Sequence, residues 1–158
     1  MKYLFDTNIC IYLINKKFEY LMDSIEKLGI DKIGISSITI AELEYGIAKS
    51  DSTHKEENRI ALLEFLLPFK FIDFDQNDAY EYGRIRQDLQ SKGKIIGNMD
   101  ILIGSQAVSR ELILVTNNEK EFKRIENLEI ENWIDDKEIS EFEEHQTSGG
   151  EKDRDEAS

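Results

Sequence analysis

The sequence predicts an α/β fold with a mainly parallel central sheet, and three observations support this prediction. Short apolar runs alternate along the chain with longer segments whose apolar residues recur every three or four positions. The apolar runs are uninterrupted, which is typical of strands buried on both faces of a parallel sheet. Helix-length segments separate these runs, as the crossovers between parallel strands require.

The first apolar run, 3–5, predicts a strand that ends directly in Asp6. Ligands of open α/β sheets bind at the carboxyl ends of strands, so Asp6 is a candidate functional residue. The next apolar residues have the i, i+3, i+4 spacing of a helix that packs on a sheet. Asn8 stands before them and is a residue type that favours the N-cap, so we expect this helix to begin at Asn8.

The remaining helices and strands are expected in chain order. Helices are expected over 18–28, from 39 to about 47, over 59–66, 77–90 and 101–108, with a short helical piece over 119–125. Strands are expected over 32–36, 71–74, 112–116 and 128–133. Thr39 and Glu42, three residues apart, have the capping-box pattern of a helix start. The small residues of 101–108 are expected to let that helix lie close to the sheet.

Length and composition favour one folded domain in the cytoplasm. The chain has 158 residues, of which 40% are hydrophobic and 34% charged, typical of a globular protein. No apolar run approaches the roughly 18 residues of a membrane span, and the N-terminus lacks a signal-peptide pattern. The single cysteine, Cys10, cannot form an internal disulfide.

The net charge of −13 is unevenly distributed. Residues 135–158 contain ten acidic and three basic residues, a net charge of −7, which leaves −6 for the preceding residues. We therefore expect a folded domain over 1–135 and an acidic, disordered tail over 136–158. Such acidity argues against affinity based on phosphate contacts alone, but it is compatible with an enzyme that meets phosphate through metal ions.

Three carboxylates are expected at one edge of the sheet. Asp6 follows the first strand, Glu42 lies in the first turn of the helix after the second strand, and Asp100 begins the helix before the clearest strand. Asn118 lies just beyond that strand. Each has an ordinary structural interpretation, as a helix cap, a first-turn acid or a turn residue.

Together, these carboxylates would repel one another, and no Lys or Arg stands beside them in the sequence. A divalent cation would remove this repulsion, and hard oxygen ligands favour Mg²⁺ or Mn²⁺. The group therefore predicts a metal site more strongly than any one of its members does.

Other site chemistries have less support. His54 and His145 lie in polar segments, and Cys10 has no obvious base nearby in the sequence. Neither the phosphate-binding loop motif nor the dinucleotide-binding glycine motif occurs. Asp6 could serve as the nucleophile of an aspartyl-phosphate mechanism. Haloacid-dehalogenase-like phosphatases, however, carry a second Asp two residues after the nucleophile, and this chain has Asn8 at that position.

Four segments resemble the motifs of PIN-domain ribonucleases, and more closely those of the toxin subunits of VapBC toxin–antitoxin modules. They are 3–8 (YLFDTN), 37–46 (SITIAELEYG), 96–104 (IGNMDILIG) and 114–118 (LVTNN), the last followed by Glu121 and Phe122. The resemblance runs from Met1 to about Trp133. Each motif alone is weak, whereas four in the right order at the right spacing are specific.

The resemblance implies a PIN-like nuclease domain, a three-layer α/β/α fold with a mainly parallel central sheet. It implies an endoribonuclease that depends on Mg²⁺ or Mn²⁺, with Asp6, Glu42 and Asp100 as catalytic and metal-binding residues. It also implies an RNA substrate, a homodimer and a small VapB-like antitoxin that blocks the site. Many members of the family carry a fourth acid where this chain has Asn118, and Glu121 is the nearest acid that could replace it.

Five further residues are candidates for supporting roles. Thr7 and Thr116 could hydrogen-bond metal ligands or water. Arg86, Lys92 and Lys94 precede Asp100 closely enough to be candidate contacts to the RNA backbone. Their ordinary interpretation is a solvated helix end and turn.

Two alternative functions remain open from the sequence. The first is another metal-dependent phosphoesterase, acting on DNA or a small phosphate ester, because no residue that would read a 2′-hydroxyl is identifiable. The second is a PIN-like binding module without catalytic activity. The retained acids argue against the second alternative, since a binding module has no need of uncompensated carboxylates.

Overall fold

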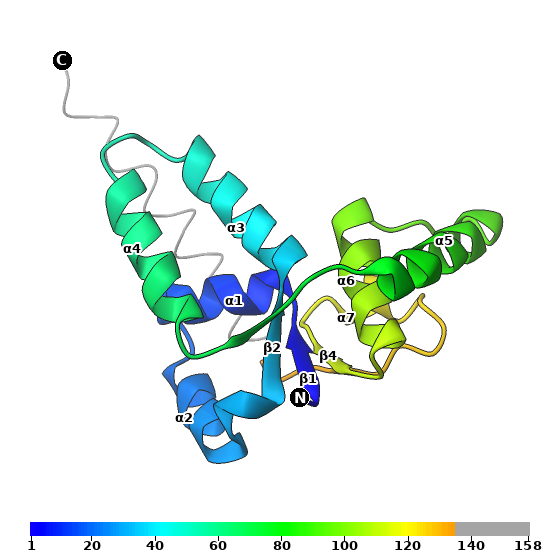
Figure 1. Cartoon of the computed structure of the whole chain (residues 1–158), viewed down its shortest axis with the longest axis horizontal. Coiled ribbons are helices and arrows are strands. Elements are labelled where there is room, and N and C mark those ends of the chain that lie inside the picture. Colours follow the sequence, from blue (N-terminus) through cyan, green and yellow to red (C-terminus); the bar gives the residue numbers. More distant parts are fainter. Residues whose placement is uncertain (135–158) are drawn as a thin grey trace.

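The computed structural model describes residues 1–134, which form a five-stranded, entirely parallel sheet between two layers of helices (Figure 1). The predicted tail, 136–158, and residue 135 lie outside the described residues. The elements are β1 (Tyr3–Phe5), α1 (Thr7–Ile14), α2 (Glu19–Leu28), the 3-10 helix η1 (Ile30–Lys32), β2 (Ile33–Ser36), α3 (Ser37–Lys49), α4 (Lys55–Leu66), β3 (Lys70–Ile72), α5 (Gln76–Ser91), α6 (Asn98–Ser109), β4 (Ile113–Val115), α7 (Glu119–Phe122) and β5 (Ile130–Glu131).

The strand order β3-β2-β1-β4-β5 places β1 in the centre of the sheet. Phe5, the last residue of β1, is in register with Ile35 of β2 and Val115 of β4. The chain builds one side of the sheet with β2 and β3, and then crosses to the other side of β1 to form β4. Sheets of this kind bind ligands where the order reverses, at the carboxyl ends of the strands. The favoured location is therefore between β1 and β4.

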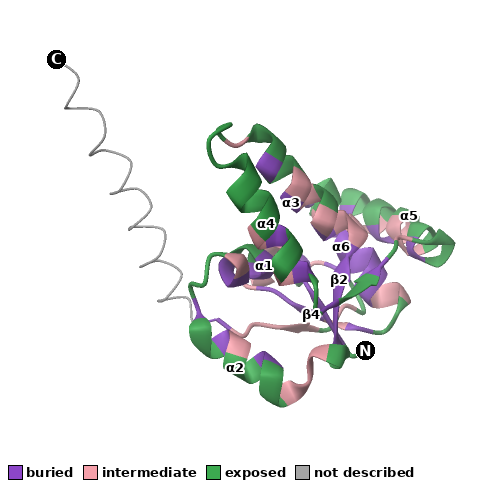
Figure 2. Ribbon diagram, turned by 60° about the vertical axis from the view of Figure 1, so that its left-hand side comes forward, coloured by how far each residue is buried: buried purple, intermediate pink, exposed green. Residues whose placement is uncertain are grey.

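Both faces of the sheet are covered, which confirms the predicted α/β/α layers. Successive strand residues point to opposite faces. Tyr3 and Phe5 belong to the hydrophobic core under helices α1–α4, whereas Leu4 belongs to the core under α5–α7. Figure 2 shows buried strands and helices that are exposed on their outward sides. Within residues 1–134, no helix combines the length and apolar character needed to cross a membrane.

Helix α1 begins earlier than expected, at Thr7, and Asn8 is not its N-cap. The cap is Asp6, whose Oδ1 accepts a hydrogen bond from the backbone N–H of Ile9 at 2.9 Å. The ordinary interpretation of Asp6 as a cap is thus correct. Because the second carboxylate oxygen remains free of this task, capping does not exclude a further role.

The capping box predicted for Thr39 and Glu42 is wrong. Helix α3 begins at Ser37, and its cap is Ser36, whose Oγ accepts from the N–H of Ile38 at 3.0 Å. Thr39 is buried inside the helix. Glu42 is therefore the sixth residue of α3, in its second turn rather than its first.

Other boundaries also differ from expectation. Helix α4 begins at Lys55 rather than at residue 59, and β3 spans Lys70–Ile72 rather than 71–74. Asp75 and Asp78 form a capping box at the start of α5 that the sequence analysis did not identify.

Gly104, one of the small residues of α6, faces a segment other than the sheet. A Cβ added to Gly104 would lie 2.7 Å from Cδ1 of Ile125, which follows α7. Gly104 therefore permits a close approach between α6 and the segment after α7, and not between α6 and the sheet.

Candidate active site

A cavity of about 410 Å³ lies beside the carboxyl end of β1. We call it the carboxylate cavity; its lining residues are Asp6, Thr7, Asn8, Ile11, Glu42, Tyr45, Gly46, Lys49, Asp100 and Asn118. Three separate elements supply its acids, since Asp6 follows β1, Glu42 lies on α3 and Asp100 lies in the first turn of α6. The structure thus brings the three predicted carboxylates to one cavity.

Asp6 is held rigidly and is almost fully buried, with 4% of its surface exposed. Its Oδ1 caps α1 through Ile9, and its Oδ2 accepts a hydrogen bond from the Thr116 hydroxyl at 2.5 Å. The Thr116 hydroxyl in turn accepts from the backbone N–H of Asn118 at 2.9 Å. Burial, with a smaller effect from the charge of Glu42, raises the pKa of Asp6 from 3.8 to about 6, although these hydrogen bonds oppose the shift.

Glu42 is oriented by Thr7, which confirms contact between this predicted supporting residue and an acid of the site. The Thr7 hydroxyl donates to Oε1 of Glu42 at 2.7 Å and lies 3.3 Å from the hydroxyl of Thr39. This hydroxyl links α1 to α3 and sets where Glu42 enters the carboxylate cavity.

Asp100 faces the other acids from α6 and is partly buried. Burial raises its pKa from 3.8 to about 6, and the negative charges of Asp6, Glu121 and Glu42 contribute further. The repulsion expected from the sequence is therefore present in the folded protein.

Asn118 and Glu121 occupy different positions relative to the cavity. Asn118 lines it, and its side-chain amide donates to Oε2 of Glu121 at 2.9 Å. Glu121 is not a lining residue, although its charge acts on Asp100. The Asn118 amide thus holds Glu121, the acid that could have substituted for the missing fourth carboxylate.

The cavity is also lined by one cationic side chain that was not predicted from the sequence. Lys49 is on α3, with its Nζ 5.5 Å from the centre of the Tyr45 ring. Spacings of three and four residues from Glu42 to Tyr45 and then to Lys49 put all three on one helix face, and this signal was present in the sequence. Even so, no Lys or Arg forms an ion pair with the cavity's acids anywhere in the described part of the chain.

The three predicted RNA-contacting cations do not line the carboxylate cavity. Lys92 forms ion pairs with Asp88 and Glu126, both at 2.9 Å. Arg86 donates a hydrogen bond to the Tyr82 hydroxyl at 2.9 Å, and Lys94 is exposed. Their role in RNA binding stays a prediction.

The chemistry of the cavity fits a hard divalent cation. Its donors are carboxylate and amide oxygens, and a cation near them would offset both the cost of burying the charged carboxylates and their mutual repulsion, which together raise the pKa values of Asp6 and Asp100. Within residues 1–134, no three acidic, His or Cys side chains are close enough to enclose an ion by themselves. Mg²⁺ does not need such a cage, because it keeps several waters and commonly binds through one or two carboxylates.

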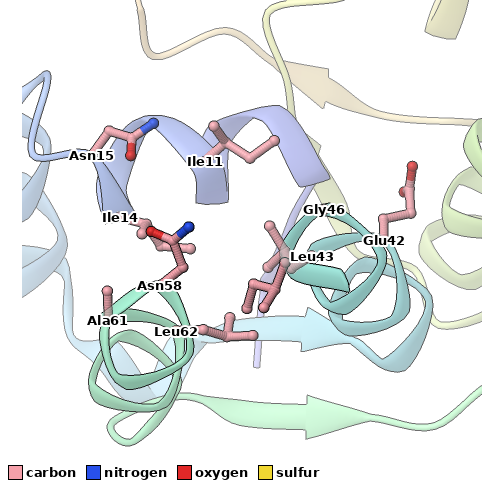
Figure 3. A pocket seen from close by; sticks show the side chains of 10 residues that line it. Ile11, Ile14, Asn15, Glu42, Leu43, Gly46, Asn58, Ala61 and Leu62 are labelled. Carbon is pink, nitrogen blue, oxygen red and sulfur yellow. The ribbon is translucent and has the colours of Figure 1, made fainter. Parts of the chain in front are cut away.

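An apolar groove adjoins the carboxylate cavity. It runs between α1, α3 and α4, has a volume of about 360 Å³, and carries Glu42 at its edge (Figure 3). Ile11 and Gly46 line both the groove and the carboxylate cavity. A segment bound in this groove would therefore lie beside Glu42, at the edge of the carboxylate cavity.

Comparison with known proteins agrees with this architecture. Residues 3–128 match the PIN domain family. The chain belongs to the PIN-domain family. Within this family it is VapC-like, being 48% identical to ribonuclease VapC2 of Rickettsia felis over 134 residues, which cover 84% of this chain and 98% of that protein. It is 39% identical to the tRNA(fMet)-specific endonuclease VapC of Salmonella typhimurium, with the same coverage.

A solved VapC-like structure has the same fold. This chain superimposes on a chain of the VapBC2 complex of Rickettsia felis, which was crystallised with a DNA fragment from its promoter, with a TM-score of 0.76 and 46% identity. The match covers 85% of this chain and 100% of that chain. The predicted PIN-like architecture is thus confirmed.

Proposed function

We propose that this protein is a metal-dependent endoribonuclease and the toxin component of a type II toxin–antitoxin module. The observation that carries this proposal is the convergence of Asp6, Glu42 and Asp100 on one cavity, with no ion pair to neutralise them among residues 1–134. Relatives named as ribonucleases and as a tRNA-specific endonuclease support RNA as the substrate.

In this proposal, Asp6 and Asp100 hold Mg²⁺ or Mn²⁺, and Glu42 completes the shell directly or through water. Such an ion, when bound, lowers the pKa of a coordinated water and offsets charge that develops on the phosphoryl oxygens. Each carboxylate oxygen has two lone pairs, so the hydrogen bonds from Ile9 and Thr116 leave Asp6 able to bind a ligand.

The protein's own contribution is to position these acids. Thr116 and the α1 N-terminus fix Asp6, and Thr7 fixes one oxygen of Glu42, so neither carboxylate has to reorganise during the reaction. The Asn118 amide keeps Glu121 turned toward itself. With three acids and an amide instead of four acids, the site would hold one ion firmly and a second only with substrate present.

We also propose that a VapB-like antitoxin places a segment in the groove between α1, α3 and α4. The groove is mainly apolar and opens beside Glu42, so its occupant would cover the acids. The solved relative that is a VapBC complex supports an antitoxin partner. A homodimer and a cytoplasmic location are further parts of the proposal, implied by the family.

Cleavage assays with the purified full chain test the proposed function. Single-stranded RNA and DNA are each incubated with Mg²⁺, with Mn²⁺ and with EDTA. We expect RNA cleavage with either metal and none with EDTA. Cleavage of DNA alone would instead support the phosphoesterase alternative, and cleavage of neither, with RNA still bound, would support an inactive binding module.

A further inference from the structure

We propose that Tyr45 and Lys49 form an RNA subsite on the wall of the carboxylate cavity, in which Tyr45 stacks on a base and Lys49 contacts a phosphate. The base and the phosphate would flank the phosphodiester held by the acids. This inference rests on the proposed ribonuclease function and specifies how its substrate is held.

The geometry of α3 supports this subsite. Both residues line the cavity that contains Asp6 and Asp100, so a strand bound at the acids passes over them. Glu42 and Lys49 are seven residues apart, which is two turns and a rise of about 10 Å. Nucleotides beside a bound phosphodiester lie within reach of this length of helix.

The exposure of Tyr45 points to a ligand that stacks. Its side chain is 67% exposed, although it lines a cavity. Single-stranded nucleic acids are recognised by exposed aromatic rings on which their bases stack, and such stacking tolerates any base. An aromatic ring beside a phosphodiester-cleaving site suits this mode of binding.

The net negative charge of the cavity would repel a polyanionic ligand unless a cation lies close by. The lining residues include three acids and one Lys, and the whole chain has a net charge of −13. A phosphate chain approaching the acids therefore needs a local cation. Lys49 supplies it, with its ammonium over one face of the Tyr45 ring, 5.5 Å from the ring centre, where cation–π attraction holds it; the base would stack on the opposite face.

Fluorescence anisotropy tests the stacking role in the full chain carrying Asp6→Asn, which prevents cleavage. The probe is a fluorescein-labelled single-stranded RNA in buffer with Mg²⁺. Tyr45→Ala should weaken binding by about tenfold or more, whereas Tyr45→Phe should stay within about twofold because it keeps the ring. Tyr80→Ala is the control, since Tyr80 is 74% exposed on α5 and outside the cavity.

The salt dependence of binding tests the phosphate contact separately. Lys49→Ala should reduce the slope of log Kobs against log salt by about 0.7, the value expected for one phosphate contact on a single strand. Tyr45→Ala should leave this slope unchanged. Lys27→Ala, at an exposed lysine on α2, is the matched control, and its slope should equal that of the chain carrying Asp6→Asn alone.

An unchanged affinity for Tyr45→Ala, or the same loss for Tyr80→Ala, would overturn the stacking role. An unchanged slope for Lys49→Ala would overturn the phosphate contact and favour a protein partner on this face. Absence of RNA binding by the Asp6→Asn background would overturn the whole subsite. Cleavage of the same RNA by the unmodified chain, measured in parallel, shows separately whether the proposed ribonuclease function stands.

Discussion

Asp6 has a structural task as the cap of α1 and, in the proposed function, a chemical task as a metal ligand. Its Oδ1 caps α1, and its Oδ2 accepts a hydrogen bond from the hydroxyl of Thr116, which follows β4. The position of Asp6 therefore depends on both sides of the point between β1 and β4 where the strand order reverses. An isolated carboxylate this deeply buried is costly, which is reflected in its raised pKa. Because no Lys or Arg within residues 1–134 forms an ion pair with Asp6, this cost supports the proposal that the site binds a cation.

The stability of the metal-free protein should depend on pH through Asp6 and Asp100. Their pKa values are near 6 in the folded chain against 3.8 ordinarily, so the folded state binds more protons between these values. The free energy of unfolding contributed by these groups therefore falls as pH rises through about 6. In EDTA, Asp100→Asn should melt about 2–4 °C above the unmodified chain at pH about 7.5, since it removes repulsion.

Melting curves of both proteins, recorded in EDTA from pH about 4.5 to 8, check this prediction. The difference between them should shrink toward zero at the acidic end, where Asp100 is protonated anyway. Comparing the two proteins cancels carboxylates with lowered pKa values, such as Asp78. A difference that stays constant with pH, or a variant that melts far lower throughout, would mean that Asp100 is a structural acid.

Asn118 should limit metal affinity in the free protein. Asn118→Asp adds a carboxylate to the cavity and should tighten Mn²⁺ binding by about tenfold, a typical size for changes around metal ligands. Asn118→Ala should have a milder effect, because it removes a neutral amide and its hydrogen bond to Glu121 but no charge. Titration calorimetry with Mn²⁺ measures both, with Glu121→Gln alongside. Loss of binding in Glu121→Gln with no change in Asn118→Asp would assign the fourth position to Glu121 instead.

At the scale of helices and strands, the periodicity of apolar residues predicted well which helices and strands exist and in what order they follow, because burial against the sheet determines both. The starts of helices were predicted less well. Asn8 and Thr39 are good cap residues, yet Asp6 and Ser36 cap α1 and α3, since each stands directly at the end of a strand. A propensity scale contains no information about where the chain leaves a sheet.

Contacts between helices were the part that sequence could not supply. Lys49 lines the cavity because α3 packs beside α1. A second example is the buried hydrogen bond between Ser36 and Gln106, which are 70 positions apart in the sequence. The Ser36 hydroxyl donates to Oε1 of Gln106, and Nε2 of Gln106 donates to the carbonyl of Ile72. This link ties the start of α3, which carries Glu42, to α6, which carries Asp100.

Gln106→Leu should destabilise the protein by about 2–4 kcal/mol, because it removes the acceptor of the buried Ser36 hydroxyl proton and the amide donor to the carbonyl of Ile72. Urea unfolding at 25 °C measures the change. Ser105→Ala is the control: Ser105 is equally buried, but its hydroxyl bonds only to Ile101 of its own helix, so its loss should cost less than about 1 kcal/mol. Equal effects of the two substitutions would refute the link as a specific support.

At the scale of the whole molecule, the alternation of strands and helices was sufficient to predict the parallel sheet and the edge that carries the acids. Parallel strands place all their carboxyl ends together, so Asp6, Glu42 and Asp100 could be grouped before their distances were known. The charge distribution is a separate property of the chain. Removal of 141–158 deletes seven acidic and two basic residues, a net charge of −5.

This truncation should tighten RNA binding severalfold at low salt, because part of a repulsive field is removed. The gain should disappear at high salt, where screening is strong. The melting temperature should change by less than about 2 °C, since the deleted sequence has almost no apolar residues. Anisotropy titrations at two salt concentrations and one melting curve measure both effects. A large drop in melting temperature would show that this segment packs on the folded domain.

The most direct test of the whole account is the rate of RNA cleavage by Asp6→Asn, Glu42→Gln and Asp100→Asn with saturating Mn²⁺. Glu26→Gln, at an exposed glutamate of α2, is the control. The account predicts that each cavity variant loses at least about a hundredfold in rate, as removal of a group that stabilises transition-state charge does, while the fold and the control's rate remain unchanged. Near-native, metal-dependent cleavage by any of the three variants would contradict the assignment of that residue, and by all three it would contradict the site.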